Sequence, residues 1–467
     1  MLIIKTFLYF LRNILFFFKN IVPFFKNILY FFKNILFLLH VVGIVLYEYI
    51  LHADFIDNIL HKLSRKNILY IKLFQACALN SSICNNINTN LNDKLMTFCD
   101  NAPWTLNDID FETLQQLEEN YQIHISDKQQ PINTGMISLV YKGSIVQSDG
   151  IENPIIVKIK RKNIEERLNV AIEHVLFVLM LVDWVPFLTT YDLLAVIKKN
   201  ISLITQQVNF NTEVKNMQKF QTYCQRLNYI KIPTVYPECT SQLPNVILME
   251  YVEGKTIQHI EKADREIYAK HLMKFVYLTT FLYGSYHGDL HLGNILFLKD
   301  DTDNGYKLCI LDFGIVYELE HTKDAAFDIV SSIIKTPPEE IAEKILHSGL
   351  IEPVEVIRSI KPMHYASLIR VLSEFINQSV HIEKKLNHHQ LFIFLSELNV
   401  FINSIESSGA NSISKKGSRL RISDDLMKIQ VFFAMNHGVM LTLCEGINYI
   451  ALSDRVMQET FHLDLFV

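Results

Sequence analysis

Two short stretches of the chain combine residue types that could carry out phosphoryl transfer. They read HGDLHLGN at residues 287–294 and LDFG at residues 311–314. An aspartate five residues before an asparagine matches a catalytic loop in which Asp289 faces the phosphoryl acceptor as the base and Asn294 binds a metal ion. Asp312 is then expected to be the second metal ligand. Carboxylate and amide oxygens suit Mg²⁺, which takes few protein ligands and adds phosphate oxygens and water.

The segment between these two stretches is expected to bring them together. Residues 295–297 and 308–311 are apolar runs on either side of a polar turn at 300–305. This pattern predicts a β-hairpin. Asn294 and Asp312 then come from the two ends of one hairpin, within reach of a shared ion. The alternative is a hairpin unrelated to phosphoryl transfer.

A lysine and a glutamate upstream extend this arrangement. Residues 157–160 alternate as a strand, which places Lys158 where a small lobe carries its phosphate-binding lysine. Glu213 lies in a helical-looking segment, 211–220, and we expect its carboxylate to hold the Lys158 ammonium against the phosphates. The alternatives are a solvated strand lysine and an ordinary helix-surface glutamate. The 55 residues that separate the pair require a helical insertion in the small lobe.

Two further segments are expected to enclose a nucleotide. Only one of the three glycine positions of G-x-G-x-x-G-x-V is a glycine in this chain, which is weak support for a phosphate loop. The corresponding loop positions are Asn133, Gly135, Ser138 and Val140. Downstream, an apolar strand followed by Gly254 predicts the linker between two lobes. Backbone groups around Glu250 and Val252 are expected to meet the adenine edge there.

The N-terminal segment is charged differently from the rest of the chain. Residues 1–47 hold no acid and five bases spaced by seven residues, whereas the whole chain has a net charge of −5. The bases are Lys5, Arg12, Lys19, Lys26 and Lys33. A basic stripe on an apolar helix is typical of a membrane interface, although Pro23 should kink the helix and residues 35–47 could insert. The alternative is an apolar face that packs on the protein's own core or on another copy.

Composition limits the remaining possibilities. With 467 residues, of which 49% are hydrophobic, the chain is long enough for several structural units around a buried core. The negative net charge, with no basic stripe interleaved with aromatics beyond the N-terminus, argues against nucleic acid as a partner. Seven cysteines without metal-ligand spacing suit a reducing compartment rather than a zinc site.

Together these motifs resemble the UbiB-like atypical kinases, a family associated with coenzyme Q and membrane lipid metabolism. The loop after Pro131, the lysine and glutamate, and the HGDLHLGN and DFG stretches carry the resemblance. Residues 70–75, YIKLFQ, are similar to the family's KxGQ signature, and residues 443–446, LCEG, to its C-terminal tail. The resemblance implies that Lys72 and Gln75 belong to an N-terminal extension that folds over the nucleotide site.

The chain departs from the family pattern at three places. Phe74 replaces the glycine of KxGQ, residues 207–209 read QVN where the family has E-x-D, and the loop at 133–135 lacks the family's alanines. The Lys, Glu, Asp, Asn and Asp set is intact. That set favours retained nucleotide binding.

The resemblance implies an α+β, protein-kinase-like fold of two lobes, with a helical N-terminal extension and a helical large lobe. The expected domains are a membrane-associating segment at 1–60, the extension at 61–130, the small lobe with its helical insertion at 131–252, the large lobe at 253–402 and a C-terminal helical tail at 403–467.

The function that the resemblance implies is a kinase or ATPase that binds ATP or ADP with Mg²⁺. It is expected to act at a membrane, with membrane lipids as partners. The sequence leaves the organelle open, with mitochondrial and host-cell membranes among the candidates, and a lipid or a lipid-pathway protein is a candidate acceptor. One alternative is a small-molecule kinase similar to choline or aminoglycoside phosphotransferases, which share HGDLH-x-GN but lack the extension. The other is a nucleotide-binding membrane scaffold without catalysis. An ordinary protein kinase is disfavoured because no Ala-Pro-Glu follows Gly314.

Overall fold

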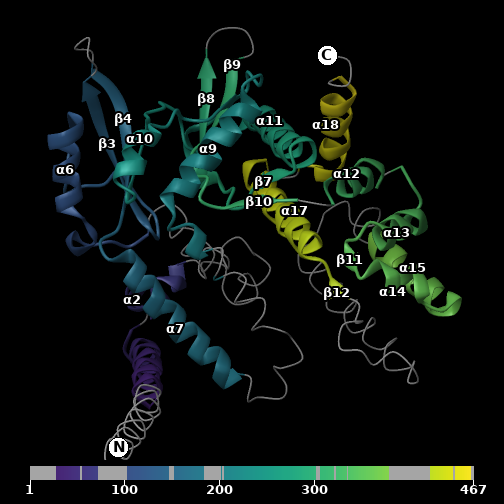
Figure 1. Ribbon diagram of the computed structural model, residues 1–467, viewed down its shortest axis with the longest axis horizontal. Coiled ribbons are helices and arrows are strands. Elements are labelled where there is room, and N and C mark those ends of the chain that lie inside the picture. Colours follow the sequence, from purple (N-terminus) through teal and green to yellow (C-terminus); the bar gives the residue numbers. More distant parts are fainter. Residues whose placement is uncertain are drawn as a thin grey trace, which may run out of the picture.

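The computed structural model contains an α+β protein of two lobes, as the sequence predicts (Figure 1). It describes residues 28–52, 55–71, 102–146, 152–182, 201, 204–300, 305–319, 322–333, 335–377, 421–444 and 447–463. The strands β3 and β4 lie at one end of the molecule and the helices α12 to α15 at the other, with α9 and the β8–β9 hairpin between them.

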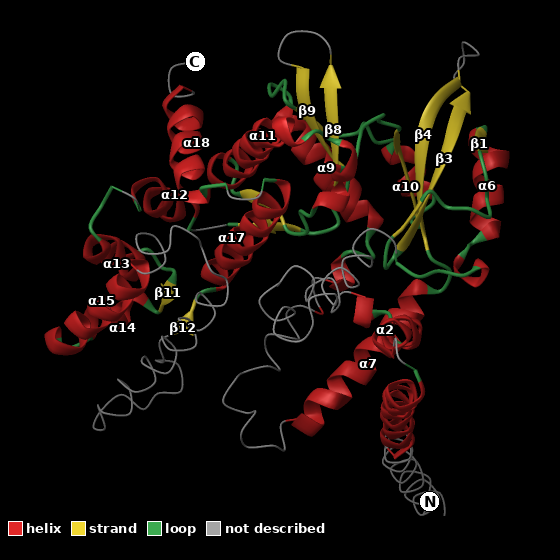
Figure 2. Cartoon of the chain, turned by 180° about the vertical axis from the view of Figure 1, so that it is seen from behind, coloured by secondary structure: helices red, strands yellow, loops and turns green. Residues whose placement is uncertain are grey.

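An antiparallel sheet forms the small lobe, with strand order β1-β3-β4-β6 and with β2 also paired to β3. Its strands are β1 (Ile123–Ile125), β2 (Asn133–Thr134), β3 (Ser138–Val146), β4 (Glu152–Lys160) and β6 (Val246–Glu250). Buried side chains on one face, among them Leu139 and Val157, pack with Leu114 and Leu117 of α6 (Phe111–Tyr121). The short helix α10 (Pro237–Gln242) comes immediately before β6, and Figure 2 shows α6 beside β1.

The helix α9 (Phe210–Cys224) carries Glu213 and begins at Asn209, whose side chain accepts a hydrogen bond from the Thr212 N–H. The insertion that the sequence requires before it is confirmed, because β4 leads directly into α7 (Ile164–Val182). The extension contacts α7, since Asn67 Nδ2 donates to Ala171 O at 3.2 Å. Asn67 follows α2 (Phe55–Lys66).

The large lobe is built on α11 (Arg265–Tyr277), which continues into a π-helical turn at Leu278–Leu282. The predicted hairpin is confirmed as β8 (Ile295–Asp300) and β9 (Gly305–Ile310), with Ile295 opposite Ile310. Strand β5 (Ile230–Lys231) pairs with β9 in parallel, and β7 (Ser285–His287) pairs with β10 (Val316–Glu318). The remaining elements are α12 (Lys323–Ser332), α13 (Pro338–His347), β11 (Ile351–Glu352), α14 (Val354–Ser359), α15 (Pro362–Asn377), β12 (Arg421–Ile422), α17 (Asp424–Leu443) and α18 (Tyr449–Leu463).

The last two helices pack on the large lobe. Ser453 of α18 is hydrogen bonded to the Tyr277 hydroxyl, and Glu459 pairs with Lys270 of α11 at 2.8 Å. The α17 backbone is tied to β7, because the Tyr286 hydroxyl donates to Lys428 O. The described part of the expected tail therefore braces the strand that leads into the HGDLHLGN stretch.

Candidate active site

Lys158 lies at the centre of the site and is 9% exposed. Its Nζ atom is 2.6 Å from Glu213 Oε1 and 2.7 Å from Asp312 Oδ2. The β4 register sets this position, because Lys158 pairs with Val140 on β3 and with Ile247 on β6. The expected pairing of Lys158 with Glu213 is confirmed, and one ammonium bridges a carboxylate from each lobe.

The charges of these three groups shift one another's pKa values. Burial alone would lower the pKa of Lys158, but Asp312 and Glu213 outweigh it and raise that pKa. Burial likewise favours a protonated Asp312, yet the neighbouring Lys158 ammonium holds the Asp312 pKa below its usual range. Burial raises the pKa of Glu213 to about 7. When both carboxylates are ionised, the trio carries one negative charge in excess of its single cation.

The loop that holds Asp289 and Asn294 lies against Asp312. Asn294 Nδ2 donates to Asp289 O at 3.0 Å, and the Leu311 N–H donates to Asn294 O at 3.0 Å. His287 Nδ1 accepts from the Asp289 N–H at 3.2 Å, so the proton of the neutral ring is on Nε2, which donates to Asp312 O. These hydrogen bonds hold the backbone of the loop that carries Asn294 against the backbone at Leu311 and Asp312, so the two predicted metal ligands are kept close to each other.

Gly288 is required by the packing of this loop. A Cβ atom there would lie 2.4 Å from Tyr317 Cε2 and 2.5 Å from Ile315 Cγ2, much closer than carbon atoms approach. The Gly288 N–H donates to Ile315 O at 2.8 Å, which holds the two segments at that spacing.

Phe313 and Gly314 set the direction of the Asp312 carboxylate. The Phe313 ring is fully buried, with its centroid 4.9 Å from the Phe220 ring of α9 and 5.0 Å from the His287 ring. The Gly314 N–H donates to Asp312 Oδ1 at 2.8 Å. One carboxylate oxygen is thus held by the backbone and the other by Lys158.

The donor set at the hairpin ends fits Mg²⁺ bound together with a nucleotide. Asn294 and Asp312 offer one amide and one carboxylate, and no described group of three or more His, Cys, Asp or Glu side chains could hold a metal ion. Mg²⁺ characteristically takes one or two carboxylates with phosphate oxygens and water, whereas zinc and calcium need fuller protein shells.

Among the predicted loop residues, Gly135 lies in the turn between β2 and β3. Asn133 belongs to β2, and Ser138 and Val140 belong to β3. The Gly135 N–H donates to Ser138 O at 2.9 Å, and Asn133 pairs with Val140. Val140 is also the strand partner of Lys158, so this turn lies at the end of the sheet that carries the site lysine.

Glu250 and Val252 lie where β6 ends and the chain leaves the small lobe. The Glu250 carboxylate is turned toward Lys231 and the Thr234 N–H, and the Glu250 N–H donates to Thr234 O at 2.8 Å. Those groups are therefore engaged within the protein. Lys72 and Gln75 fall outside the described residues, so their expected place over the site stays a prediction.

Gln207 makes a contact that no motif in the sequence predicts. Its Nε2 atom donates to Asp289 Oδ2 at 3.3 Å, although 82 residues separate the two. A carboxylate can only accept, so the amide nitrogen must face Asp289 and Oε1 must face elsewhere. Gln207 Cγ also lies 3.7 Å from the position that a Gly314 Cβ would take, which places this side chain between the loop and Asp312. The resemblance marks 207–209 only as a departure from E-x-D.

The two lobes, the bridging lysine and the HGDLHLGN loop define a protein of the kinase-like class. Residues 105–345 match the ABC1 atypical kinase-like domain, which is about half of the chain. The chain therefore belongs to the ABC1 family, as the UbiB-like resemblance indicates.

Similar proteins include two from Arabidopsis thaliana. Protein ACTIVITY OF BC1 COMPLEX KINASE 8, chloroplastic, is 24% identical over 216 residues, and KINASE 3, chloroplastic, is 28% identical over 213 residues. Each match covers 44% of this chain and 28% of the relative, so the chain spans less than a third of these relatives' length.

Two solved structures are similar to the chain at low identity. The Rv3197–erythromycin complex from Mycobacterium tuberculosis is 17% identical, with a TM-score of 0.46 over 75% of this chain and 82% of that one. The Rio2 kinase–ADP/Mg²⁺–phosphoaspartate complex from Chaetomium thermophilum is 11% identical, with a TM-score of 0.25 over 77% of this chain and 78% of that one.

Proposed function

We propose that this protein is an atypical kinase or ATPase that binds ATP or ADP with Mg²⁺ and acts at a membrane in coenzyme Q or lipid metabolism. The observation that carries the proposal is the buried Lys158 ammonium, shared by Glu213 and Asp312 next to Asn294. A structural ion pair would need one carboxylate, whereas a second one leaves negative charge that a divalent cation can offset.

Each side chain then has a role in phosphoryl transfer. Lys158 binds the phosphates and Glu213 keeps its ammonium in place. Asp289 accepts the proton of the acceptor hydroxyl, while the side-chain amides of Gln207 and Asn294 hold that aspartate in position by donating to its carboxylate and to its backbone carbonyl. Asn294 and Asp312 would hold Mg²⁺, which supplies charge neutralisation of the phosphates.

The proposed membrane contact rests on the helix Ile28–Leu51. Its 24 residues are long and apolar enough to cross a membrane, and 6% of its most apolar stretch is buried. One face packs on α7, because Phe37 stacks on His174 with ring centroids 3.6 Å apart and Phe31 contacts Phe177. The other face exposes large apolar side chains, among them Leu29, Phe32, Leu36, Leu39, Leu46 and Ile50. Exposure on this scale suits lipid.

The same arrangement bears on where the protein acts. The alternative is that the helix Ile28–Leu51 packs only on the protein's own core. That alternative accounts for the helix face that contacts α7, but it does not explain the exposed apolar face. The chloroplastic names of the relatives favour an organelle membrane, with membrane lipids as partners and a lipid or lipid-pathway protein as acceptor.

The test is nucleotide turnover by the purified full chain, with and without anionic liposomes. We expect Mg²⁺-dependent ATP binding and turnover that rises when liposomes are present. Absence of Mg²⁺-dependent nucleotide binding would contradict the proposal. Binding without turnover under either condition would favour the scaffold alternative, which gains support from Gln207 standing where the family has a carboxylate.

A further inference from the structure

Arg161 immediately follows β4 and its side chain is 1% exposed. Two of its nitrogens donate to one carbonyl, with Nη2 at 2.7 Å and Nε at 3.0 Å from Gly135 O. Gly135 is the first residue of the loop between β2 and β3 and the middle one of the three glycine positions of the phosphate-loop motif. A buried guanidinium thus holds the proposed phosphate loop by its backbone.

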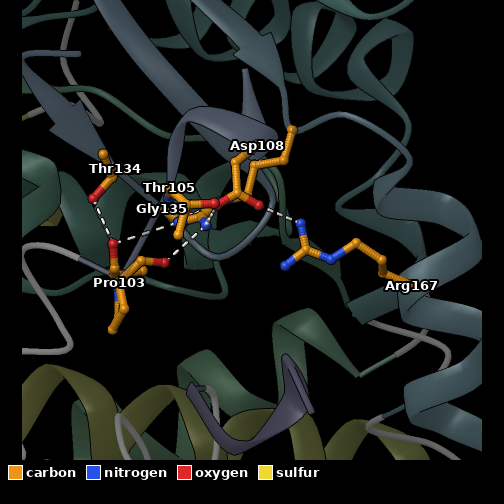
Figure 3. A network of polar contacts seen from close by, with 8 residues as sticks. Pro103, Thr105, Asp108, Thr134, Gly135 and Arg167 are labelled. Atoms are coloured by element: carbon orange, nitrogen blue, oxygen red, sulfur yellow. Dashed lines mark hydrogen bonds and ion pairs between the residues drawn. The ribbon is translucent and has the colours of Figure 1, made fainter. Parts of the chain in front are cut away.

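The other edge of the same guanidinium holds the N-terminal extension. Nη1 donates to Pro103 O at 2.8 Å, Nη2 lies 3.4 Å from Ala102 O, and Nη1 lies 3.3 Å from Asp108 Oδ2. Figure 3 shows Pro103, Gly135 and Asp108 gathered in this network. One side chain therefore joins the extension to the loop.

A second contact joins the same two segments without Arg161. The Thr134 hydroxyl donates to Ala102 O at 2.7 Å, and the Ala102 N–H donates to Thr134 O at 2.8 Å. Both Thr134 atoms belong to β2, next to Gly135. The loop is therefore fixed to the extension at two consecutive residues.

The cost of burying a cation explains why this arrangement is restrictive. A buried guanidinium is stable only when its donors are satisfied. Burial lowers the pKa of Arg161 to about 10, which still leaves it charged at neutral pH, while Asp108 opposes that shift. Gly135 O cannot move away without leaving two of these donors unpaired. The arginine thus limits the loop to conformations that keep this carbonyl in place.

We infer that Arg161 is a positioning residue that holds the phosphate loop in its binding conformation and makes nucleotide affinity depend on the extension segment 102–108. The inference rests on the proposed nucleotide site. This glycine-poor loop is hydrogen bonded to Arg161 and to the extension, so it needs little further ordering when a nucleotide binds. The nucleotide affinity therefore depends on these contacts, which lie outside the nucleotide site.

The test compares Arg161→Lys with Arg167→Lys in the full chain. Lysine keeps a cation but cannot hold Gly135 O and Pro103 O together. Arg167 also bonds Asp108, yet its side chain is 40% exposed, and Arg167→Lys is therefore the matched control. We expect the Mg-ATP dissociation constant to rise tenfold or more in Arg161→Lys and to stay within twofold in the control.

Hydrogen exchange of residues 130–140 gives a second readout that needs no nucleotide. We expect exchange there to speed up at least tenfold in Arg161→Lys, with β6 unchanged. Thr134→Val should act in the same direction and decides the matter if Arg161→Lys does not fold. Unchanged loop exchange in these variants would overturn the inference. If loop exchange is faster in Arg161→Lys but the wild type itself binds no Mg-ATP, the result contradicts the proposed function and leaves the positioning role of Arg161 intact.

Discussion

Lys158 bridges two carboxylates that lie 55 and 154 residues from it in the sequence. The first contact is predictable, because a strand lysine and a helix glutamate in that order match a known arrangement. The second contact reflects how the lobes pack, and the sequence assigns Asp312 only a metal-binding role. The position of Gln207 beside Asp289 follows from the same packing and has no sequence signal.

Asp312→Asn should remove the stabilisation that Mg-nucleotide gives. A ligand at about 100 times its dissociation constant adds about 2.7 kcal/mol to a folded state that alone binds it. The substitution nearly preserves volume and the Gly314 N–H can still bond the side-chain oxygen, but the charge that attracts the metal is lost. Thermal unfolding with ATP, with and without Mg²⁺, measures the difference. Equal Mg²⁺-dependent shifts in both proteins would count against the site.

Lys158→Met should destabilise the protein even without nucleotide. It leaves Glu213 and Asp312 without their shared cation, and removing one partner of a buried pair costs about 3–5 kcal/mol. Lys219→Met is the matched control, because Lys219 and Glu318 form a half-exposed pair worth about 0–1 kcal/mol. Urea unfolding of both variants gives the comparison. Similar decreases in the free energy of unfolding of the two variants would show that removing the Lys158 cation from its two carboxylates costs no more than breaking a half-exposed ion pair.

At the scale of elements, local patterns decide which parts are predictable. The β8–β9 hairpin follows from two apolar runs around a polar turn, and the α7 insertion follows from the 55 residues between Lys158 and Glu213; both are present. Strand β5 pairs with β9 through only two residues of each strand, which are about 78 positions apart in the sequence, so no local pattern predicts this pairing. The network of Arg161 is likewise invisible, because an arginine after a strand is usually a surface residue.

His271 of α11 should make the stability of the large lobe depend on pH. Burial, Lys274 and Lys270 lower its pKa to about 4, although Glu459 pairs with both lysines. The unfolded chain takes up this proton near pH 6.5 and the folded chain near pH 4, so acidification across that window favours unfolding. The contribution of neutral His271 to the free energy of unfolding is fully present above pH 6.5 and is lost as the pH falls toward 4.

Urea unfolding of wild type and His271→Gln at pH 7, 6 and 5 isolates this contribution. The variant should lose less stability than the wild type between pH 7 and pH 5, because other titrating groups are common to both. A difference between the two proteins that stays constant with pH would rule out the buried neutral histidine.

At the scale of the whole molecule, the order of motifs along the chain was enough to predict the kinase-like fold. The order predicts which strand carries the lysine, which helix carries the glutamate and which hairpin carries the proposed metal ligands. It contains no information on how the N-terminal helix sits. The structure places that helix against α7, through rings that a repeat of apolar residues does not single out.

Deleting residues 1–60 should release the protein from membranes and leave Mg-nucleotide binding intact, because every described site residue lies beyond residue 130. Flotation with anionic liposomes measures the first effect and thermal shifts the second. Changing Lys5, Arg12, Lys19, Lys26 and Lys33 to Glu separates charge from insertion, since each base near an anionic surface contributes about 1 kcal/mol. Full retention after deletion would place the anchor elsewhere, near residues 431–443. Failure to fold would favour packing of this helix on the protein's own core.

The chain on both sides of β6 is bonded to one hairpin of the large lobe. Before it, β5 pairs with β9, and after it, Lys255 exchanges two backbone hydrogen bonds with Phe297 of β8, at 2.9 and 2.8 Å. Hinge motion requires connecting residues that can change their backbone angles freely. Rotation of the small lobe would break bonds on both sides at once, so we expect slow nucleotide exchange and a long residence time, limited by local opening of the loop at 133–138.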